Sequence, residues 1–360
     1  MKSQTSNQRN VLYGLLLSLL TVACSLEQRS AESNPKVEVS LKDKQRGAHV
    51  FGRMDSTDFQ FLAKDHVEWV TLVPYGYQEG IASSEVFHHR GDSARMQRRN
   101  ERWLQQIKST REAGYKVFVK PHIWMRTSAD GKWRSDIYPA DDESWEQWKL
   151  TYRHFILRYA RLAEAAGAEM FCVGAELTRL TLEKPEYWRE LITEVRTVFS
   201  GKLTYAANWY REFEGITFWD QLDYVGVQAY FPLCDHENPD VAKIAEGWKR
   251  HIPALEKIHL KSGRPVLFTE LGYKSTPNSA QKPWEWMEYE NMDEMKVSFE
   301  TQSNCYRAFF QTIWPKHWFA GVHLWQYRSD FEALTKDLQF DFTPQGKPAE
   351  EVIKEGFKRK

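Results

Sequence analysis

The stretch FCVGAE at residues 171–176 is apolar and strand-like, and it ends in a glutamate, Glu176. A second stretch, VLFTE at residues 266–270, repeats the arrangement and ends in Glu270. In an eight-stranded β/α barrel, residues at the ends of strands 4 and 7 reach the same rim of the barrel. The two carboxylates would then form a close pair, which is the arrangement that hydrolysis of a glycosidic bond requires.

Short apolar runs alternate with long amphipathic stretches from about residue 47 onward, which is typical of repeated β/α units. We expect strands near residues 48–51, 69–73, 116–120, 170–174, 203–206, 224–228, 266–269 and 321–325. We expect helices over residues 93–113, 144–166, 185–199, 241–260 and 301–315. Eight strands are what a closed barrel needs, so the sequence predicts the α/β class and a single (β/α)8 TIM-barrel domain.

Two of the predicted helices carry signals at their ends. Residues 141–144, with the sequence DDES, offer capping oxygens and negative charge just before the helix that follows them. Gly114 and Gly167 directly follow the first two helices, where a residue in the left-handed conformation commonly ends a helix.

Composition excludes some classes of function. The chain has 49 basic and 49 acidic side chains, and its only basic block is the short tail 358–360, so nucleic acid is not an expected partner. With 360 residues and 42% hydrophobic content it can bury one large core, and we expect a monomer. Its 15 Trp, 16 Tyr and 20 Phe suit the partly apolar faces of sugars, although many of these rings must be core.

The N-terminus predicts export. Lys2 and Arg9 precede an apolar run at residues 11–22 that is too short to span a membrane, as in a signal peptide. The run ends in LTVAC, which resembles a bacterial lipobox with its Leu displaced by one position. We therefore expect a lipoprotein-type signal peptide over residues 1–23 and lipidation of Cys24, or else ordinary cleavage with an unmodified cysteine. The protein would be anchored to a membrane, in the periplasm or at the cell surface.

The rest of the chain divides into a linker and one domain. Residues 24–46 are polar and lack periodicity, which predicts a tether, and the catalytic domain is expected over residues 47–360. The three cysteines beyond Cys24 do not suggest a disulfide framework, and Cys172 within a strand is expected to pack as a small hydrophobe.

Long connections follow several predicted strands, over residues 75–92, 123–142, 231–240 and 273–300. In a barrel they gather on the C-terminal face, and their aromatic residues could form a groove for a chain of sugar rings. These residues are Tyr75, Tyr77, Trp124, Trp133, Tyr138, Trp284, Trp286 and Tyr289. Packing within its own loop is the alternative for Trp284. The pair His88-His89 invites a metal site, but adjacent loop histidines rarely bind one ion, so we expect neither a metal nor a cofactor.

Each glutamate suits one catalytic role. Partly apolar walls around Glu176 would disfavour its charged form, as a general acid requires, although it could instead pair with Arg179 or cap the next helix. Glu270 would have to stay ionised and fixed as a nucleophile, and Tyr230 at the end of a neighbouring strand is placed to hold it. An ion pair at the strand end is the alternative for Glu270.

Eight short motifs, in this order along the chain, resemble glycoside hydrolase family 113, a β-mannanase family of retaining (β/α)8 enzymes. They are KPH at 120–122, VGAE at 173–176, LTYAANW at 203–209, FWD at 218–220, LDYVG at 222–226, AYFPL at 229–233, FTELGY at 268–273 and WQY at 325–327. The resemblance covers roughly residues 47–350.

The resemblance implies a role for individual residues. Glu176 corresponds to the acid/base and Glu270 to the nucleophile of a double displacement on β-1,4-mannosidic linkages. Tyr230 resembles the tyrosine that orients the nucleophile, and Trp325 the tryptophan beneath the sugar at the cleavage point. His122 and Asn208 resemble polar residues of the same rim and are expected to bind sugar hydroxyls. Apart from the resemblance, Trp124 and Trp284 of the aromatic-rich loops are also expected to bind substrate.

Two departures from the family pattern leave the sugar preference open. Ala175 precedes the acid/base where the wider clan has asparagine, and Asn208 could supply that amide. Ile123-Trp124 follows His122 where the family often has an acidic residue. The alternatives are a retaining hydrolase of a glucan or glucomannan, an exo-acting mannosidase, and a non-catalytic carbohydrate-binding lipoprotein. A pair of carboxylates argues against the last of these, because a binding protein has no need of it.

Overall fold

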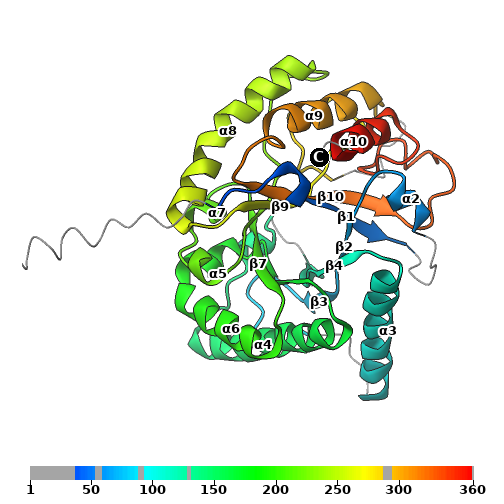
Figure 1. The fold of residues 1–360 in the computed structure, drawn as a ribbon. Helices are drawn as coiled ribbons and strands as arrows, with labels where there is room; N and C mark the ends of the chain where they lie inside the picture. The colour runs from blue at the N-terminus through cyan, green and yellow to red at the C-terminus, as the bar shows by residue number, and fades with distance from the viewer. Residues whose placement is uncertain (1–36, 53–58, 88–92, 128–130, 287–293, 359–360) are drawn as a thin grey trace, which may run out of the picture. The chain divides into compact units, whose positions relative to one another are not determined.

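The computed structural model describes residues 37–52, 59–87, 93–127, 131–286 and 294–358 (Figure 1). The chain separates into two units, Met1–Lys36 and Val37–Lys360. The expected signal peptide, Cys24, the pair His88-His89 and Tyr289 therefore lie outside the described residues. Within the described part of the chain, no helix is both long and apolar enough to cross a membrane.

Eight parallel strands form a closed barrel, which confirms the predicted TIM barrel. Their order around the barrel is β1 (Gln45–Phe51), β10 (Phe319–Arg328), β9 (Val266–Leu271), β8 (Val225–Gln228), β7 (Lys202–Asn208), β6 (Met170–Ala175), β4 (Lys116–Val119) and β2 (Trp69–Leu72). All eight predicted strands are present, with ends that differ by a few residues. Glu176 thus directly follows barrel strand 4, β6, and Glu270 lies on barrel strand 7, β9.

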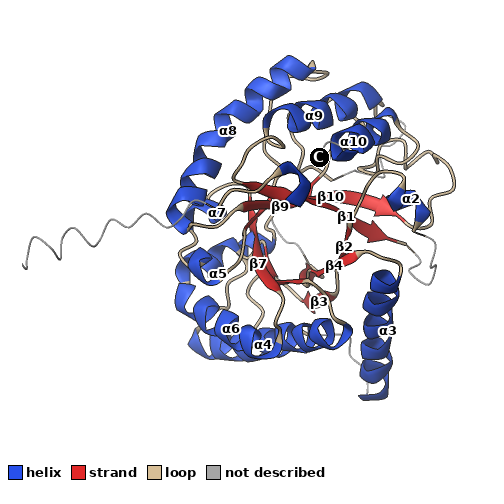
Figure 2. Cartoon of the chain, viewed as in Figure 1, coloured by secondary structure: helices blue, strands red, loops and turns tan. Residues whose placement is uncertain are grey.

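Helices surround the barrel and cover the outer faces of the strands (Figure 2). The five predicted helices are confirmed as α3 (Ser93–Glu112), α4 (Asp142–Ala166), α6 (Pro185–Val198), α8 (Val241–Ser262) and α9 (Phe299–Thr312). The side chain of Asp141 caps α4 by accepting a hydrogen bond from the Ser144 amide at 2.8 Å. Gly114 and Gly167 follow α3 and α4 with φ of 93° and 75°, so the expected left-handed stops are confirmed.

The core has two parts because successive strand residues face opposite sides. On β6, Phe171 and Val173 join the large cluster that the helices cover, whereas Met170 and Cys172 join a smaller cluster. The smaller cluster holds strand residues and no residue of a surrounding α-helix, so it fills the barrel interior. Cys172 is fully buried and unpaired, as expected for a packing residue.

Several elements were not predicted. They are the helices α2 (Gln60–Ala63), α5 (Thr178–Glu183), α7 (Glu212–Gly215) and α10 (Pro348–Lys358), and the strands β3 (Tyr75–Gln78) and β5 (His122–Met125). The two strands pair in parallel above the barrel, with Tyr75 opposite His122 and Tyr77 opposite Trp124. Parts of two long connections are therefore ordered as a small sheet, and this sheet fixes His122 and Trp124 at the rim.

The prediction that residues 24–46 form a tether is wrong for residues 37–46. Strand β1 begins at Gln45, and Lys44, Gln45 and Arg46 are all buried. The Lys44 ammonium donates to the Lys316 carbonyl at 2.7 Å, and the Arg46 Nε donates to the Phe357 carbonyl at 2.7 Å. Polar composition misled the prediction because these cations are buried against carbonyl groups that come from the far end of the chain.

Candidate active site

A cavity of about 660 Å³ opens at the C-terminal ends of the barrel strands. Every predicted catalytic and substrate-binding residue lines it: Glu176, Glu270, His122, Asn208, Tyr230, Trp325, Trp124 and Trp284. Its walls also hold Tyr75, Trp133, Arg134, Trp209, Trp286 and Phe342. The structure therefore brings the two carboxylates and the six expected binding residues together in one cavity, and it adds further side chains to the cavity wall.

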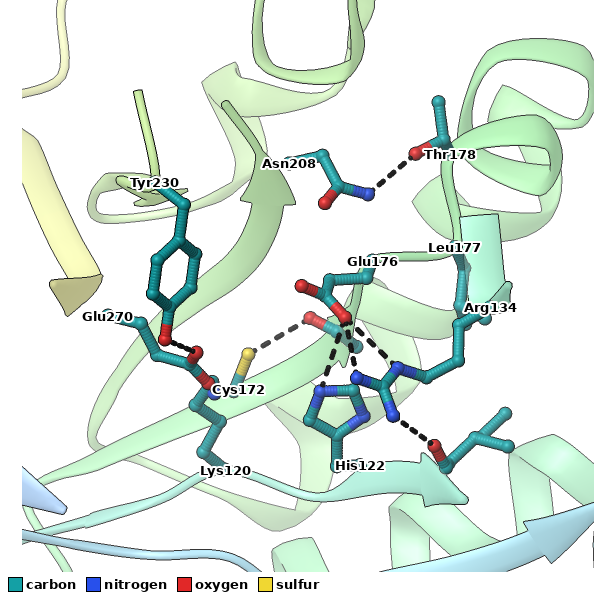
Figure 3. Close-up of polar contacts among 12 residues, drawn as sticks. Lys120, His122, Arg134, Cys172, Glu176, Leu177, Thr178, Asn208, Tyr230 and Glu270 are labelled. Carbon is teal, nitrogen blue, oxygen red and sulfur yellow. Dashed lines mark hydrogen bonds and ion pairs between the residues drawn. The ribbon is translucent and has the colours of Figure 1, made fainter. Parts of the chain in front are cut away.

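Glu270 is held at both of its carboxylate oxygens (Figure 3). The hydroxyl of Tyr230 donates to Oε2 at 2.7 Å, which confirms the expected contact, and the ammonium of Lys120 contacts Oε1. The Nε2 of His49 lies 3.9 Å from the same Oε1. Burial, with the nearby charge of Glu176, raises the pKa of Glu270 overall. The charge of Lys120 acts in the lowering direction and so favours the ionised form that a nucleophile needs.

Glu176 directly follows β6 and has a φ of 58°, in the left-handed region. For a residue other than glycine this conformation costs on the order of 1 kcal/mol, and it persists only where the surroundings hold it. The guanidinium of Arg134 donates to Oε2 from Nε at 3.0 Å and lies 2.9 Å away through Nη2. No described residue donates a hydrogen bond to Oε1, which is left for a substrate.

The alternative pairing of Glu176 with Arg179 is wrong. Arg179 instead pairs with Glu183 at 2.9 Å, and the cation beside Glu176 is Arg134 from the long connection after β5. That contact joins residues 42 positions apart, and nothing in the local sequence around Arg134 indicates it. Lys120 could have been predicted as a residue of the site, because it belongs to the KPH motif and follows an apolar strand.

His122 lies between Lys120 and Arg134, the cations that contact the two carboxylates (Figure 3). Its Nε2 is 3.7 Å from Oε2 of Glu176, and its ring stacks on Tyr75 with centroids 6.1 Å apart. Burial lowers the pKa of His122 well below its usual value, and the charges of Arg134 and Lys120 lower it further, so the imidazole is neutral. The residue lines the cavity, so His122 is a candidate contact for a sugar hydroxyl.

Asn208, at the end of β7, faces the cavity beside Glu176 (Figure 3). Its amide Nδ2 donates to the hydroxyl of Thr178 at 2.9 Å. This bond fixes the plane of the amide and directs Oδ1 away from Thr178, as expected for a residue that accepts from a sugar hydroxyl.

Aromatic rings occupy the floor and the sides of the cavity. Trp325 is 6% exposed and packs against His49 and Phe51, with centroids 5.1 and 5.0 Å away. Trp284 stacks on Trp209 at 5.3 Å yet stays 43% exposed, so it does not pack within its own loop. Trp124, on β5, is 47% exposed. Exposed indole rings in a cavity with aromatic walls and a few polar groups suit the apolar faces of sugar rings.

No group of three or more His, Cys, Asp or Glu side chains that could hold a metal is present in the described ranges. What the cavity does offer is two buried carboxylates with different partners, one held by a lysine and a tyrosine and the other by an arginine. Such a difference in surroundings is how two like groups take the separate roles of nucleophile and acid/base.

Residues 45–347 match the model of Glycoside Hydrolase Family 113. A solved β-1,4-mannanase of this family is 25% identical, with a TM-score of 0.74 over 88% of this chain and 100% of its own. The β-mannanase AaManA from Alicyclobacillus acidocaldarius, solved in complex with ManMIm, is 26% identical, with a TM-score of 0.72 over 87% and 97%. The β-glucuronidase of Ruminococcus gnavus, at 14% identity, shares the fold. No curated protein matches. The chain therefore belongs to glycoside hydrolase family 113 and is a glycoside hydrolase.

Proposed function

We propose that this enzyme is a retaining endo-β-mannanase that cleaves β-1,4-mannosidic linkages in mannan-type polysaccharides or oligosaccharides. The observation that carries the proposal is the pair of carboxylates in one aromatic-walled cavity, with Glu270 fixed by Tyr230 and Lys120. Two solved members of the same family are β-mannanases, at 25% and 26% identity, which supports this choice of sugar.

In the first step, the carboxylate of Glu270 attacks the anomeric carbon of the bound sugar. Glu176 gives its proton to the glycosidic oxygen, the bond between that oxygen and the anomeric carbon breaks, and a covalent glycosyl enzyme forms. In the second step Glu176, now ionised, takes a proton from water while the water oxygen attacks the anomeric carbon and releases Glu270. The product keeps the β configuration because the anomeric carbon is inverted twice.

The neighbouring residues support each half of this reaction. Tyr230 and Lys120 hold both oxygens of Glu270, which keeps the nucleophile ionised and fixed in direction. Arg134 binds only Oε2 of Glu176, so the other oxygen can carry the proton toward the leaving group.

The test is incubation with mannan, glucomannan and cellulose oligosaccharides, followed by chromatography of the products. We expect internal cleavage of mannan and mixed short products from wild type, and none from Glu270→Ala. Proton NMR in the first minutes should show the β anomer. Release of mannose alone would indicate an exo-acting enzyme, and preferred cleavage of cellulose oligosaccharides would indicate a glucanase. Undiminished cleavage by Glu270→Ala would exclude Glu270 as the nucleophile.

We also propose that the enzyme is exported and anchored to a membrane through a lipid on Cys24, and that it acts as a monomer. The motif LTVAC at residues 20–24 and the apolar run before it support the anchor. Metabolic labelling with a fatty acid should mark the wild type but not Cys24→Ser, and only the wild type should sediment with membranes. Equal labelling of both proteins would exclude lipidation at Cys24. For the monomer, the test is analytical ultracentrifugation of a chain that begins after Cys24, and sedimentation as a dimer would contradict the proposal that the enzyme is monomeric.

A further inference from the structure

Glu212 is a buried carboxylate that lies next to the cavity but does not line it. It begins α7, shortly after Asn208, and it is fully buried. Its Oε2 accepts from the backbone N–H of Asn208 at 2.7 Å and from the hydroxyl of Thr178 at 3.0 Å. Its Oε1 accepts from the hydroxyls of Tyr205 at 2.7 Å and Thr181 at 2.9 Å.

Hydrogen bonds, rather than a cation, hold this carboxylate, because no described Lys, Arg or His forms an ion pair with it. Burial raises the pKa of Glu212 to about 7, and the four donors oppose that rise because they bind the ionised form. A glutamine would fill the same space, but its NH2 group would face two donors where the carboxylate presents an acceptor.

One of these donors, Tyr205, connects Glu212 to the backbone beside the acid/base Glu176. The hydroxyl of Tyr205 donates to Glu212 and accepts the backbone N–H of Leu177 at 2.7 Å. Leu177 directly follows Glu176, whose φ of 58° needs support from its surroundings. The carboxylate of Glu212 thereby fixes the direction of the hydroxyl that satisfies the peptide bond immediately after the acid/base.

Glu212 also holds Asn208, both directly and through Thr178. Glu212 accepts the backbone N–H of Asn208 directly, and it accepts the hydroxyl of Thr178, whose oxygen in turn accepts from the side-chain amide of Asn208 at 2.9 Å. One carboxylate thus connects the end of β6, the end of β7 and the start of α5, which are the elements on the Glu176 side of the cavity.

We propose that Glu212 is a positioning residue that aligns the acid/base Glu176 and Asn208 for departure of the leaving group. The inference rests on the proposed roles of Glu176 and Glu270. Glu212 should affect the acid/base and not the nucleophile. None of its four donors contacts Glu270, which Lys120 and Tyr230 hold instead.

The test compares kcat/KM for two substrates that share their sugars, phenyl β-mannobioside and 2,4-dinitrophenyl β-mannobioside. Phenolate must be protonated as it leaves, whereas dinitrophenolate leaves without an acid, so only the first substrate needs a well-placed Glu176. We expect Glu212→Gln to lose on the order of 100-fold on the phenyl substrate, as a misplaced catalytic group does, and only a few-fold on the dinitrophenyl substrate.

Two further variants complete the test. Tyr205→Phe removes the hydroxyl that links Glu212 to the Leu177 amide, and it should give the same selective loss even where Glu212→Gln does not fold. Asp65→Asn is the matched control, because it also replaces a buried carboxylate by an amide but lies away from the cavity, and the ratio of the two substrates should equal that of wild type.

An equal loss on both substrates in Tyr205→Phe and in folded Glu212→Gln would overturn the inference and leave Glu212 a purely structural residue. That result differs from failure of the proposed function, which would appear in the wild type itself. A wild type that cleaves neither mannobioside would overturn the proposed function and this inference together.

Discussion

Lys120 is the main group that favours the ionised form of the nucleophile. Glu270 is 5% exposed, and burial alone favours its neutral form, which cannot attack an anomeric carbon. The ammonium of Lys120 contacts Oε1 and opposes this effect, and the Tyr230 hydroxyl adds a hydrogen bond at Oε2. Both groups therefore favour the ionised carboxylate, the Lys120 cation more than the Tyr230 hydroxyl, and both hold its orientation.

Replacing Lys120 by methionine should move the acidic limb of the pH–rate profile to higher pH. Loss of the ammonium removes the main effect that opposes burial and raises the pKa of Glu270 further, so a higher pH is needed to ionise the nucleophile. We expect the half-maximal point of kcat/KM on the acidic side to rise by about 1–3 pH units, the usual effect of a close opposite charge. Tyr230→Phe is the matched control and should shift it by less. An acidic limb that stays in place in Lys120→Met would show that another group controls it.

Individual elements show what could be predicted from the sequence and what could not. Barrel strands such as β6 and β9 are buried on both faces, so each appears as a continuous apolar run and was found. Strand β3 has the sequence YGYQ with alternating burial and only four residues, which is too short for a period to be recognised. The partner of Glu176 was missed for another reason, since Arg134 reaches it through tertiary contact alone.

Asp65, which follows α2 and lies near Tyr327 of β10 and Glu350 of α10, is a carboxyl that burial makes unfavourable to ionise. Asp65 is 1% exposed, and its Oδ1 has no hydrogen-bond partner among the residues that the structure describes. Oδ2 accepts from the Tyr327 hydroxyl at 3.0 Å. Burial and then the charge of Glu350 raise the pKa of Asp65 to about 7, while Tyr327, Lys64 and Lys354 act in the lowering direction. The folded protein therefore holds this proton to higher pH than the unfolded chain does.

Asp65→Asn should stabilise the protein at high pH and change little at low pH. In the wild type the contribution of Asp65 to the free energy of unfolding falls as pH rises from about 4 to about 7, because the unfolded chain loses this proton first. An amide has no such proton to lose. We expect the gain from the substitution to be about 2–3 kcal/mol larger at pH 8 than at pH 5, measured by urea unfolding. A gain that is the same at both pH values would show that Asp65 is ionised throughout.

Across the whole molecule, the two ends of the described chain meet where β1 joins β10 and closes the barrel. The backbone N–H of Val39 donates to the His317 carbonyl at 2.7 Å, just before β10 begins. The side chain of Arg46, at the start of β1, donates to the carbonyl of Phe357 in α10. Figure 1 shows α10 beside α9 on the side of the barrel that carries β1 and β10. Residues 37–46 are thus part of the closure, whereas Met1–Lys36 form a separate unit.

Two truncations should therefore behave differently. A chain that begins at Val37 keeps every contact of the closure, so we expect it to unfold at the same temperature as a chain that begins at Cys24, with equal activity. A chain that begins at Gly47 lacks the first two residues of β1 and the buried hydrogen bonds of Val39, Lys44 and Arg46. At about 1 kcal/mol per bond and about 1.5 °C per kcal/mol for a domain of this size, its Tm should fall by about 5 °C, measured by circular dichroism. If the chains beginning at Val37 and Gly47 melted together, residues 37–46 would be a tether after all, and closure would depend on the strand pairing from Gly47 onward.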